Sequence, residues 1–228
     1  PGTGLFTDEL VAIGANITAL EYDHTLAQQL LFKYASNKNV QVIEGDIRKF
    51  DFGSLAPRFK IVANIPYYLT ANLFRKLIDS EKKPELASLL VQKEVAERAS
   101  AEAGKMSFVA VALQVFYVTR AGEVVPAHLF EPPPKVDSQI LVLQRRETPQ
   151  IEVDKIEDFL TLLKAGFDQP RKKLISNLLG EVKCDKQVLN KAFEELGIDS
   201  SARAQELSTE QWLRMFSLLQ KNLKSPLP

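Results

Sequence analysis

Apolar and polar positions alternate along the first part of the chain in the manner of strands and helices that follow one another. Short apolar runs ending in polar residues predict buried strands, and apolar residues three or four positions apart predict helices. The predicted strands cover residues 17–20, 40–43, 59–63, 87–91, 114–118 and 139–143, and the predicted helices cover residues 5–13, 23–31, 70–78 and 93–98. This alternation is typical of a parallel, doubly wound Rossmann-like α/β sheet. The last two strands have no predicted helix between them, so we expect an antiparallel edge there.

The pattern changes after residue 147. From residue 154 onward, apolar positions recur with helical spacing only, and the predicted helices lie around residues 159–167, 174–179, 188–196 and 212–219. Consecutive helices without strands indicate a separate layer of structure. We therefore predict two domains, an α/β domain over residues 1–147 and a small all-helical domain over residues 148–228.

Composition narrows the class of protein. The chain has 228 residues, 45% of them hydrophobic and 25% charged, which is ordinary for a globular protein. No apolar run is long enough to span a bilayer, and the single Cys184 excludes an internal disulfide framework, so we expect a cytoplasmic protein without membrane contact. His24 and His128 lack metal-ligand spacing, so we expect no metal. The formal net charge is zero, so any nucleic-acid binding would depend on a local patch.

Residues that could bind a ligand stand where successive predicted strands end. Gly2 and Gly4 form a glycine turn that would let a ligand approach the backbone closely. Glu21 ends the next strand and suits the two hydroxyl groups of a ribose, and Asp46 could accept a hydrogen bond from an adenine amino group. Asn64 ends the strand after that. Each residue alone is more often a solvated strand end, but their joint appearance favours one ligand site at this edge of the sheet.

The four residues Asn64-Ile65-Pro66-Tyr67 combine a side-chain amide, a backbone fixed by proline and an aromatic ring. The amide oxygen and a backbone carbonyl could accept hydrogen bonds from an exocyclic amine, and the Tyr67 ring could stack on a nucleobase. The simpler interpretation is a turn at a strand end. Thr7 stands where a dinucleotide fingerprint needs its third glycine, and no phosphate-binding Gly-Lys-Ser/Thr loop is present. The remaining interpretation is an adenosine-containing ligand without a bound pyrophosphate, a description that fits S-adenosylmethionine.

Seven segments together carry a family resemblance. They are Pro1-Gly2-Thr3-Gly4-Leu5-Phe6-Thr7, Glu21-Tyr22-Asp23, Glu44-Gly45-Asp46, Asn64-Ile65-Pro66-Tyr67, the run from Val91 to Arg98, the run from Phe130 to Ser138, and the run from Phe167 to Leu174. These segments resemble the ordered motifs of ribosomal RNA adenine N6-dimethyltransferases. Within that family the chain is most similar to the bacterial branch that dimethylates two adjacent adenines near the 3′ end of small-subunit rRNA.

The resemblance implies S-adenosylmethionine as cofactor, small-subunit rRNA in a precursor 30S particle as partner, and a monomer. The implied catalytic residues are Asn64, Ile65, Pro66 and Tyr67. The implied cofactor-binding residues are Gly2, Gly4, Glu21, Tyr22, Asp46, Ile47 and Asn64. The implied RNA-binding residues are Lys93, Arg98, Phe130, Lys135, Arg171, Lys172 and Lys173.

One departure from the family pattern concerns the beginning of the chain. The acidic-x-glycine strand that precedes the glycine turn in the family is absent from the printed sequence, as is the segment that closes over the cofactor. We therefore expect the chain as printed to bind cofactor weakly and to fold marginally.

Two other functions stay open. One is the related large-subunit rRNA methyltransferase that confers macrolide resistance, whose helical domain differs. The other is a ribosome-assembly or transcription factor that uses the same fold without catalysis. Glu21, Asp46 and Asn64-Ile65-Pro66-Tyr67 are all intact, and this argues against a loss of catalysis.

Overall fold

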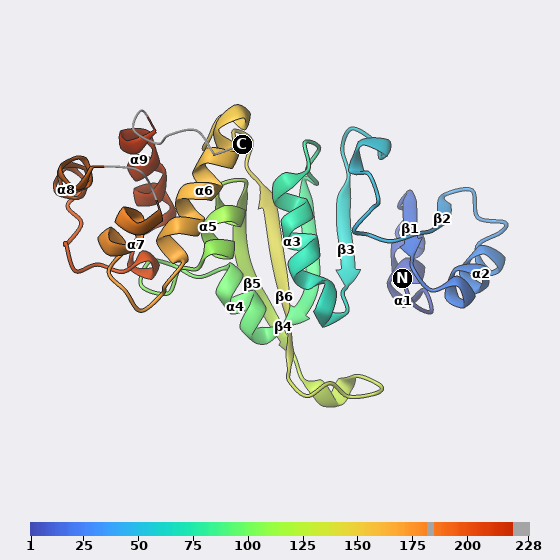
Figure 1. Cartoon of the computed structure of the whole chain (residues 1–228). Helices are drawn as coiled ribbons and strands as arrows, with labels where there is room; N and C mark the ends of the chain where they lie inside the picture. Colours follow the sequence, from blue (N-terminus) through green and yellow to red (C-terminus); the bar gives the residue numbers. More distant parts are fainter. Residues whose placement is uncertain (182–184, 221–228) are drawn as a thin grey trace. The chain divides into compact units, whose positions relative to one another are not determined.

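The computed structural model describes residues 1–181 and 185–220, and the chain divides into two compact units (Figure 1). The first unit contains Pro1–Gln92 and Gly122–Val142, and the second contains Lys93–Ala121 and the chain from Leu143 onward. This division is based on which residues pack against one another. The predicted domain boundary at residue 147 is based on the change in sequence pattern, and it stays a prediction. Cys184 lies outside the described residues.

The first unit alternates helices and strands as predicted. Its elements are α1 (Leu5–Ala12), β1 (Ile17–Glu21), α2 (His24–Lys33), β2 (Val40–Glu44), β3 (Lys60–Asn64), α3 (Thr70–Asp79) and β4 (Leu86–Gln92). β1 and β2 pair in parallel with Glu21 opposite Glu44, and β3 and β4 pair in parallel with Asn64 opposite Leu90. The predicted α/β class is therefore confirmed, and each pair of strands ends with a candidate site residue at its carboxyl edge.

The described strands form two sheets. β1 and β2 make a two-stranded sheet, and the other sheet has the order β3-β4-β6-β5, with β5 at Tyr117–Val125 and β6 at Ser138–Arg145. Gly122 packs against Ile140, while the Arg146 N–H donates to the Phe116 carbonyl at 2.8 Å. Residue numbers rise along β6 as they fall along β5, so these two strands are antiparallel. The expected antiparallel edge is confirmed.

The strand predicted at residues 114–118 is wrong in its position. Helix α5 occupies Phe108–Gln114, and β5 begins only at Tyr117. The Ser107 hydroxyl caps this helix by accepting a hydrogen bond from the Ala110 N–H at 3.2 Å. The α5 side chains from Ala110 to Leu113 are all buried, so the segment has no polar face and its periodicity alone does not separate helix from strand.

The second unit consists mainly of helices, although parts of strands β5 and β6 also belong to it. Its helices are α4 (Lys93–Ala99), α5, α6 (Ile156–Phe167), α7 (Leu174–Glu181), α8 (Lys186–Glu195) and α9 (Thr209–Leu219). Trp212 is fully buried and stacks on Phe167, with 5.4 Å between ring centroids. Gly166 leaves room for this ring, because a Cβ there would collide with it. The four helices predicted after residue 154 are confirmed.

Helix α3 follows the Asn64-Ile65-Pro66-Tyr67 segment and holds it in place. One face of α3 is apolar, and Leu73, Phe74, Leu77 and Ile78 are buried there. Figure 1 shows α3 lying alongside the strands β3 and β4. Burial of this face anchors the turn that leaves β3.

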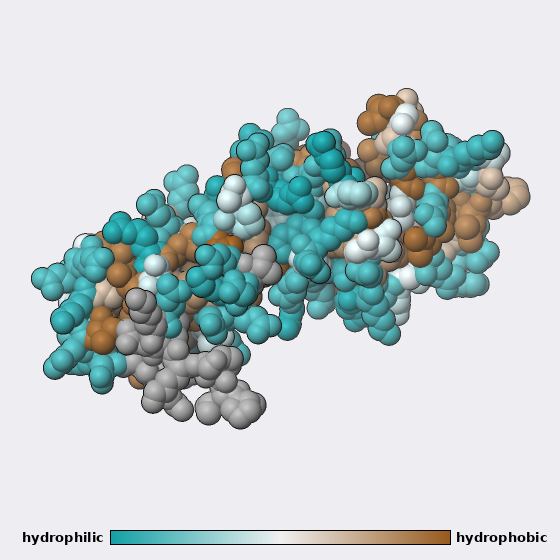
Figure 2. Space-filling model, turned by 90° about the horizontal axis from the view of Figure 1, so that it is seen from above, coloured by the Kyte–Doolittle hydropathy of each residue, from teal (hydrophilic) through white to brown (hydrophobic). Residues whose placement is uncertain are grey.

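Large apolar side chains stay exposed at the beginning of the first unit. Figure 2 shows hydrophobic residues gathered at the right of the view, over α1, β1, α2 and β2. The exposed residues in these elements and their loops include Leu5, Ile13, Tyr22, Leu31 and Phe32. This part of the chain is therefore less completely packed than the helical unit.

Candidate cofactor and substrate site

Glu21, which closes β1, carries the most buried carboxylate among the predicted cofactor residues. Its oxygens accept hydrogen bonds from the backbone N–H of Gly2 at 2.8 Å and of Asp23 at 3.0 Å. Burial raises the pKa of the Glu21 carboxyl, but the backbone hydrogen bonds from Asp23 and Gly2 oppose it, and the pKa lies below its usual value. A carboxylate offers about four acceptor positions and these two N–H groups take two, so Glu21 keeps capacity for hydroxyl donors.

The two glycines of the predicted turn differ in what surrounds them. Gly2 has a φ of 59°, and a Cβ there would meet nothing within 4 Å, so a ligand could approach its backbone beside Glu21. Gly4 has a φ of 90°, and a Cβ there would lie 2.7 Å from the Tyr34 hydroxyl. That hydroxyl donates to the Gly4 carbonyl at 3.2 Å and to Asp8 at 2.8 Å. Gly4 thus lets the turn pack on α2, while Gly2 borders open space.

Asp46 lies next to Glu21 because the Gly45 N–H donates to the Glu21 carbonyl at 2.7 Å. The Asp46 carboxylate accepts from the Arg48 guanidinium, through Nε at 2.8 and 3.0 Å and through Nη2 at 2.6 Å. The Arg48 side chain, followed by its backbone N–H, holds the pKa of Asp46 below its usual value. A ligand amine at Asp46 would therefore compete with Arg48.

Sequence reasoning did not identify Arg48. The sequence feature that could have identified it is a basic residue two positions after the acidic residue that follows a strand. This spacing allows the guanidinium and the carboxylate to form a bidentate pair. Of the other predicted cofactor residues, Ile47 is half-buried and Tyr22 is exposed. The Arg48 charge is also within electrostatic reach of Tyr22 and Tyr68, which places both tyrosines near the Asp46 loop.

The Asn64-Ile65-Pro66-Tyr67 segment leaves two acceptors unfilled. The exposed Asn64 side chain makes no hydrogen bond to any described residue. Ile65 is buried, and its N–H donates to the Leu90 carbonyl at 3.4 Å, which continues the pairing of β3 with β4. The Pro66 carbonyl accepts from the Leu69 N–H at 2.8 Å, whereas the Ile65 carbonyl accepts nothing from the described chain. Ile65 is therefore the better backbone acceptor for an amine.

Tyr67 begins the short 3₁₀ turn Tyr67–Leu69, and its side chain is half-buried. The Tyr67 hydroxyl and the Ser138 hydroxyl lie 3.0 Å apart, at the point where β6 begins. The loop before β6 carries the half-buried Phe130 and the exposed Lys135. The Asp137 carboxylate accepts from the Ala127 N–H at 2.9 Å and so closes that loop at its base.

Apart from Lys135, which lies in the first unit, the basic residues predicted to contact RNA fall into two groups in the second unit. On α4, Lys93 pairs with Glu97 at 3.9 Å, and Arg98 pairs with Glu94. Exposed pairs of this kind contribute about 0–1 kcal/mol, so phosphates could replace the acidic partners. Arg171, Lys172 and Lys173 are exposed in the turn that leads into α7. No ion pair within 4.0 Å involves these three residues within the described chain, although the Lys173 charge is close enough to help lower the pKa of Asp199.

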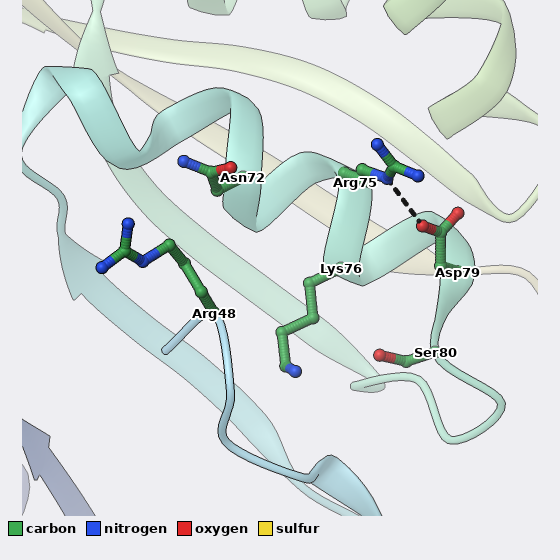
Figure 3. A pocket seen from close by; sticks show the side chains of 6 residues that line it. All are labelled: Arg48, Asn72, Arg75, Lys76, Asp79 and Ser80. Carbon is green, nitrogen blue, oxygen red and sulfur yellow. Dashed lines mark hydrogen bonds and ion pairs between the residues drawn. The ribbon is translucent and has the colours of Figure 1, made fainter. Parts of the chain in front are cut away.

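A polar hollow of about 320 Å³ lies beside α3, and Figure 3 shows its lining. The lining residues are Arg48, Asn72, Arg75, Lys76, Asp79 and Ser80. Arg75 pairs with Asp79 at 3.1 Å, and the Lys76 amine lies 5.2 Å from the centre of the Phe52 ring. Asn64 and Tyr67 are not among the lining residues, so this hollow and the predicted catalytic segment are different places in the first unit.

Across residues 1–181 and 185–220, no group of three His, Cys, Asp or Glu side chains could hold a metal ion. Over the same ranges, the helices are all too short or too polar to cross a membrane.

Known proteins place this chain in a family. The family model described as ribosomal RNA adenine dimethylase matches residues 1–221. A protein of Nostoc sp. named ribosomal RNA small subunit methyltransferase A is 36% identical over 234 residues, which cover 96% of this chain and 85% of that protein. A protein of the same name from Bacillus pumilus is 33% identical over 235 residues, covering 98% of this chain and 80% of that protein.

Solved structures agree. A dimethyladenosine transferase from Plasmodium falciparum superposes with a TM-score of 0.81 at 25% identity, covering 96% of this chain and 87% of that chain. The 23S rRNA methyltransferase ErmE superposes with a TM-score of 0.78 at 28% identity, covering 96% of this chain and 88% of that chain. The family suggested by the sequence motifs is thereby confirmed: this chain belongs to the ribosomal RNA adenine dimethylase family.

Proposed function

We propose that this chain transfers methyl groups from S-adenosylmethionine to N6 of two adjacent adenines near the 3′ end of small-subunit rRNA. The observation that carries the proposal is the pair of unfilled acceptors, the Asn64 amide oxygen and the Ile65 carbonyl, beside the Tyr67 ring. An adenine N6 amine has two hydrogens, and each acceptor can take one. The relatives from Nostoc and Bacillus support the choice of the small subunit through their names.

The residues at the β1–β2 edge fit an adenosine-containing cofactor. Glu21 is an ionised acceptor with room for ribose hydroxyls, and the open space at Gly2 lies beside it. Asp46 would accept the adenine amine after Arg48 moves aside, with Ile47 and Tyr22 next to the base. When bound, S-adenosylmethionine supplies an electrophilic methyl group on a sulfonium.

The chain's own contribution to the chemistry is positioning. The lone pair of an adenine amine is delocalised into the ring, which makes the amine a poor nucleophile. Hydrogen bonds from its two hydrogens to Asn64 and Ile65 would favour a pyramidal nitrogen with its lone pair free, and stacking on Tyr67 would fix the plane of the base. No strong base is needed before the methyl transfer, which agrees with the Asn, Pro and Tyr chemistry of the segment.

We assign RNA binding to residues of both units. Phe130 and Lys135 would lie at the target base. Lys93, Arg98 and the Arg171–Lys173 turn would contact phosphates. In this proposal residues 1–147 form the methyltransferase domain and residues 148–228 form the RNA-binding domain. The protein would act as a cytoplasmic monomer, and its substrate would be a precursor 30S particle.

Large-subunit rRNA is the alternative substrate, because the ErmE structure is similar over 96% of this chain. The 36% identity to the Nostoc small-subunit enzyme exceeds the 28% identity to ErmE, and this favours the small subunit. A role in ribosome assembly without catalysis would leave the Asn64 and Ile65 acceptors without a purpose.

The test uses the purified protein, labelled S-adenosylmethionine and small subunits that lack the modification, followed by mapping of methylated adenines. We expect N6-dimethyladenine at two adjacent positions near the 3′ end. Asn64→Ala should lower kcat by about 10²–10³-fold, as loss of a transition-state contact does. Asn72→Ala removes an exposed amide on α3 and should leave kcat unchanged. Dimethyladenine only in large subunits, or none at all, would overturn the proposal, and full activity of Asn64→Ala would remove its mechanism.

A further inference from the structure

Tyr67 and Ser138 are joined by a hydrogen bond across 71 residues of sequence, with 3.0 Å between their hydroxyl oxygens. Ser138 is 1% exposed, and Tyr67 is half-buried. A buried hydroxyl needs a partner, and each of these two supplies the other with one. The bond therefore connects the turn after β3 to the first residue of β6.

Ser138 is itself held firmly in the first unit. The preceding residue, Asp137, accepts the Ala127 N–H at 2.9 Å, and the following residue, Gln139, donates its side-chain amide to the Gly122 carbonyl at 2.9 Å. These neighbours fix the backbone on both sides of Ser138. The Ser138 hydroxyl therefore extends from a well-anchored segment of backbone and can hold another side chain in place.

The neighbouring tyrosine makes the contrast clear. Tyr68 is 75% exposed and forms no hydrogen bond within the described chain. The hydroxyl of a tyrosine lies on the axis of the second side-chain torsion, so a hydrogen bond at the hydroxyl restrains the first torsion, χ1, which sets where the ring lies. Tyr67 is restrained in this way, whereas Tyr68, one residue later on the same turn, has no such bond within the described chain.

We propose that Ser138 is a positioning residue that sets where the Tyr67 ring lies, by restraining its χ1 torsion, so that the target adenine can stack on it. This inference rests on the proposed function, because it gives Tyr67 the stacking role. A ring whose position is fixed before the base arrives loses less conformational freedom on binding, and it stays beside the acceptors Asn64 and Ile65. Ser138 also follows directly on Asp137, whose carboxylate closes the loop that carries Phe130.

The test compares Ser138→Ala, Tyr67→Phe, the double variant and Tyr68→Phe in the purified protein. Loss of one hydrogen bond, worth about 1 kcal/mol, should lower kcat about five- to tenfold in each of the first two variants, with the KM for RNA and the cofactor Kd nearly unchanged. The double variant should be no slower than either single variant, since one bond is lost in all three. Tyr68→Phe should match the wild type.

A second measurement does not depend on turnover. With ¹³C- and ¹⁵N-labelled protein, three-bond NMR couplings across Cα–Cβ should show a single χ1 rotamer for Tyr67 in the wild type and averaging over rotamers in Ser138→Ala. Multiplied kcat losses in the double variant, or an unchanged χ1 coupling in Ser138→Ala, would overturn the inference. A wild-type protein that methylates no adenine would end the proposed function, and the coupling measurement would still decide whether Ser138 fixes Tyr67.

Discussion

The first 44 residues and the C-terminal helices bury their large side chains to very different degrees. In the helices, Trp212 is completely buried and Phe159 nearly so. In the first 44 residues, Phe32 is 88% exposed and Ile13 is 78% exposed, and β1 pairs with no described strand other than β2. A pair of strands is marginally stable without further packing. Of the predicted cofactor residues, Glu21 lies in this less completely packed region and Asp46 directly follows it.

The largest expected effect comes from truncating the centre of the helical core. Trp212→Ala should lower the free energy of unfolding by about 3–5 kcal/mol, because it removes a fully buried ring stacked on Phe167. Phe32→Ala, which truncates an exposed ring on α2, should change it by less than about 0.5 kcal/mol. Urea unfolding followed by circular dichroism measures both. Equal losses would contradict the contrast between the two regions.

Bound cofactor should stabilise the first 44 residues and should not change the stability of the C-terminal helices. At 100 times its Kd, a ligand stabilises the state that binds it by about 2.7 kcal/mol, so amide exchange in β1 and β2 should slow about 100-fold. Hydrogen exchange read by mass spectrometry should show no such slowing in α6 and α9. Glu21→Gln should abolish the protection. Glu44→Gln, at the paired position on the neighbouring strand β2, should keep it.

One result would oppose this prediction. Equal protection of α6 and β1 would mean that the regions are not independent. The expectation of weak cofactor binding is separate, and calorimetry that gave micromolar binding by the chain as printed would contradict it.

A smaller effect is expected from overfilling the helical core. Gly166→Ala places a methyl group against the Trp212 ring and should cost about 1–3 kcal/mol. Gly180→Ala is the matched control, since a Cβ on this glycine of α7 would meet nothing within 4 Å. It should stabilise the protein by about 0.5–1 kcal/mol through helix propensity. Thermal unfolding of the two variants should therefore shift in opposite directions, and a shared direction would show that the core near Trp212 is loosely packed.

The residues show which parts of this molecule can be predicted from sequence. Local periodicity located the strands that end at Glu21 and Asn64, because their apolar runs are short and bounded by polar residues. It misplaced the strand at residues 114–118, because α5 is apolar on every side and only the Ser107 cap marks it as a helix. The Ser138–Tyr67 bond is beyond such patterns, since it joins residues brought together by the sheet order.

The smallest expected effect is a pH dependence at Glu21. The pKa of this carboxyl is lowered in the folded protein, so the unfolded chain binds more protons as the pH falls below the ordinary value of 4.5. The stabilisation by Glu21 is thus complete above pH 4.5 and is lost as the pH falls through the folded pKa. Its size should be below about 1 kcal/mol because solvent screens the strand end. The difference in unfolding free energy between wild type and Glu21→Gln should therefore shrink from pH 6 to pH 3, and a constant difference would show that Glu21 acts by packing and not by charge.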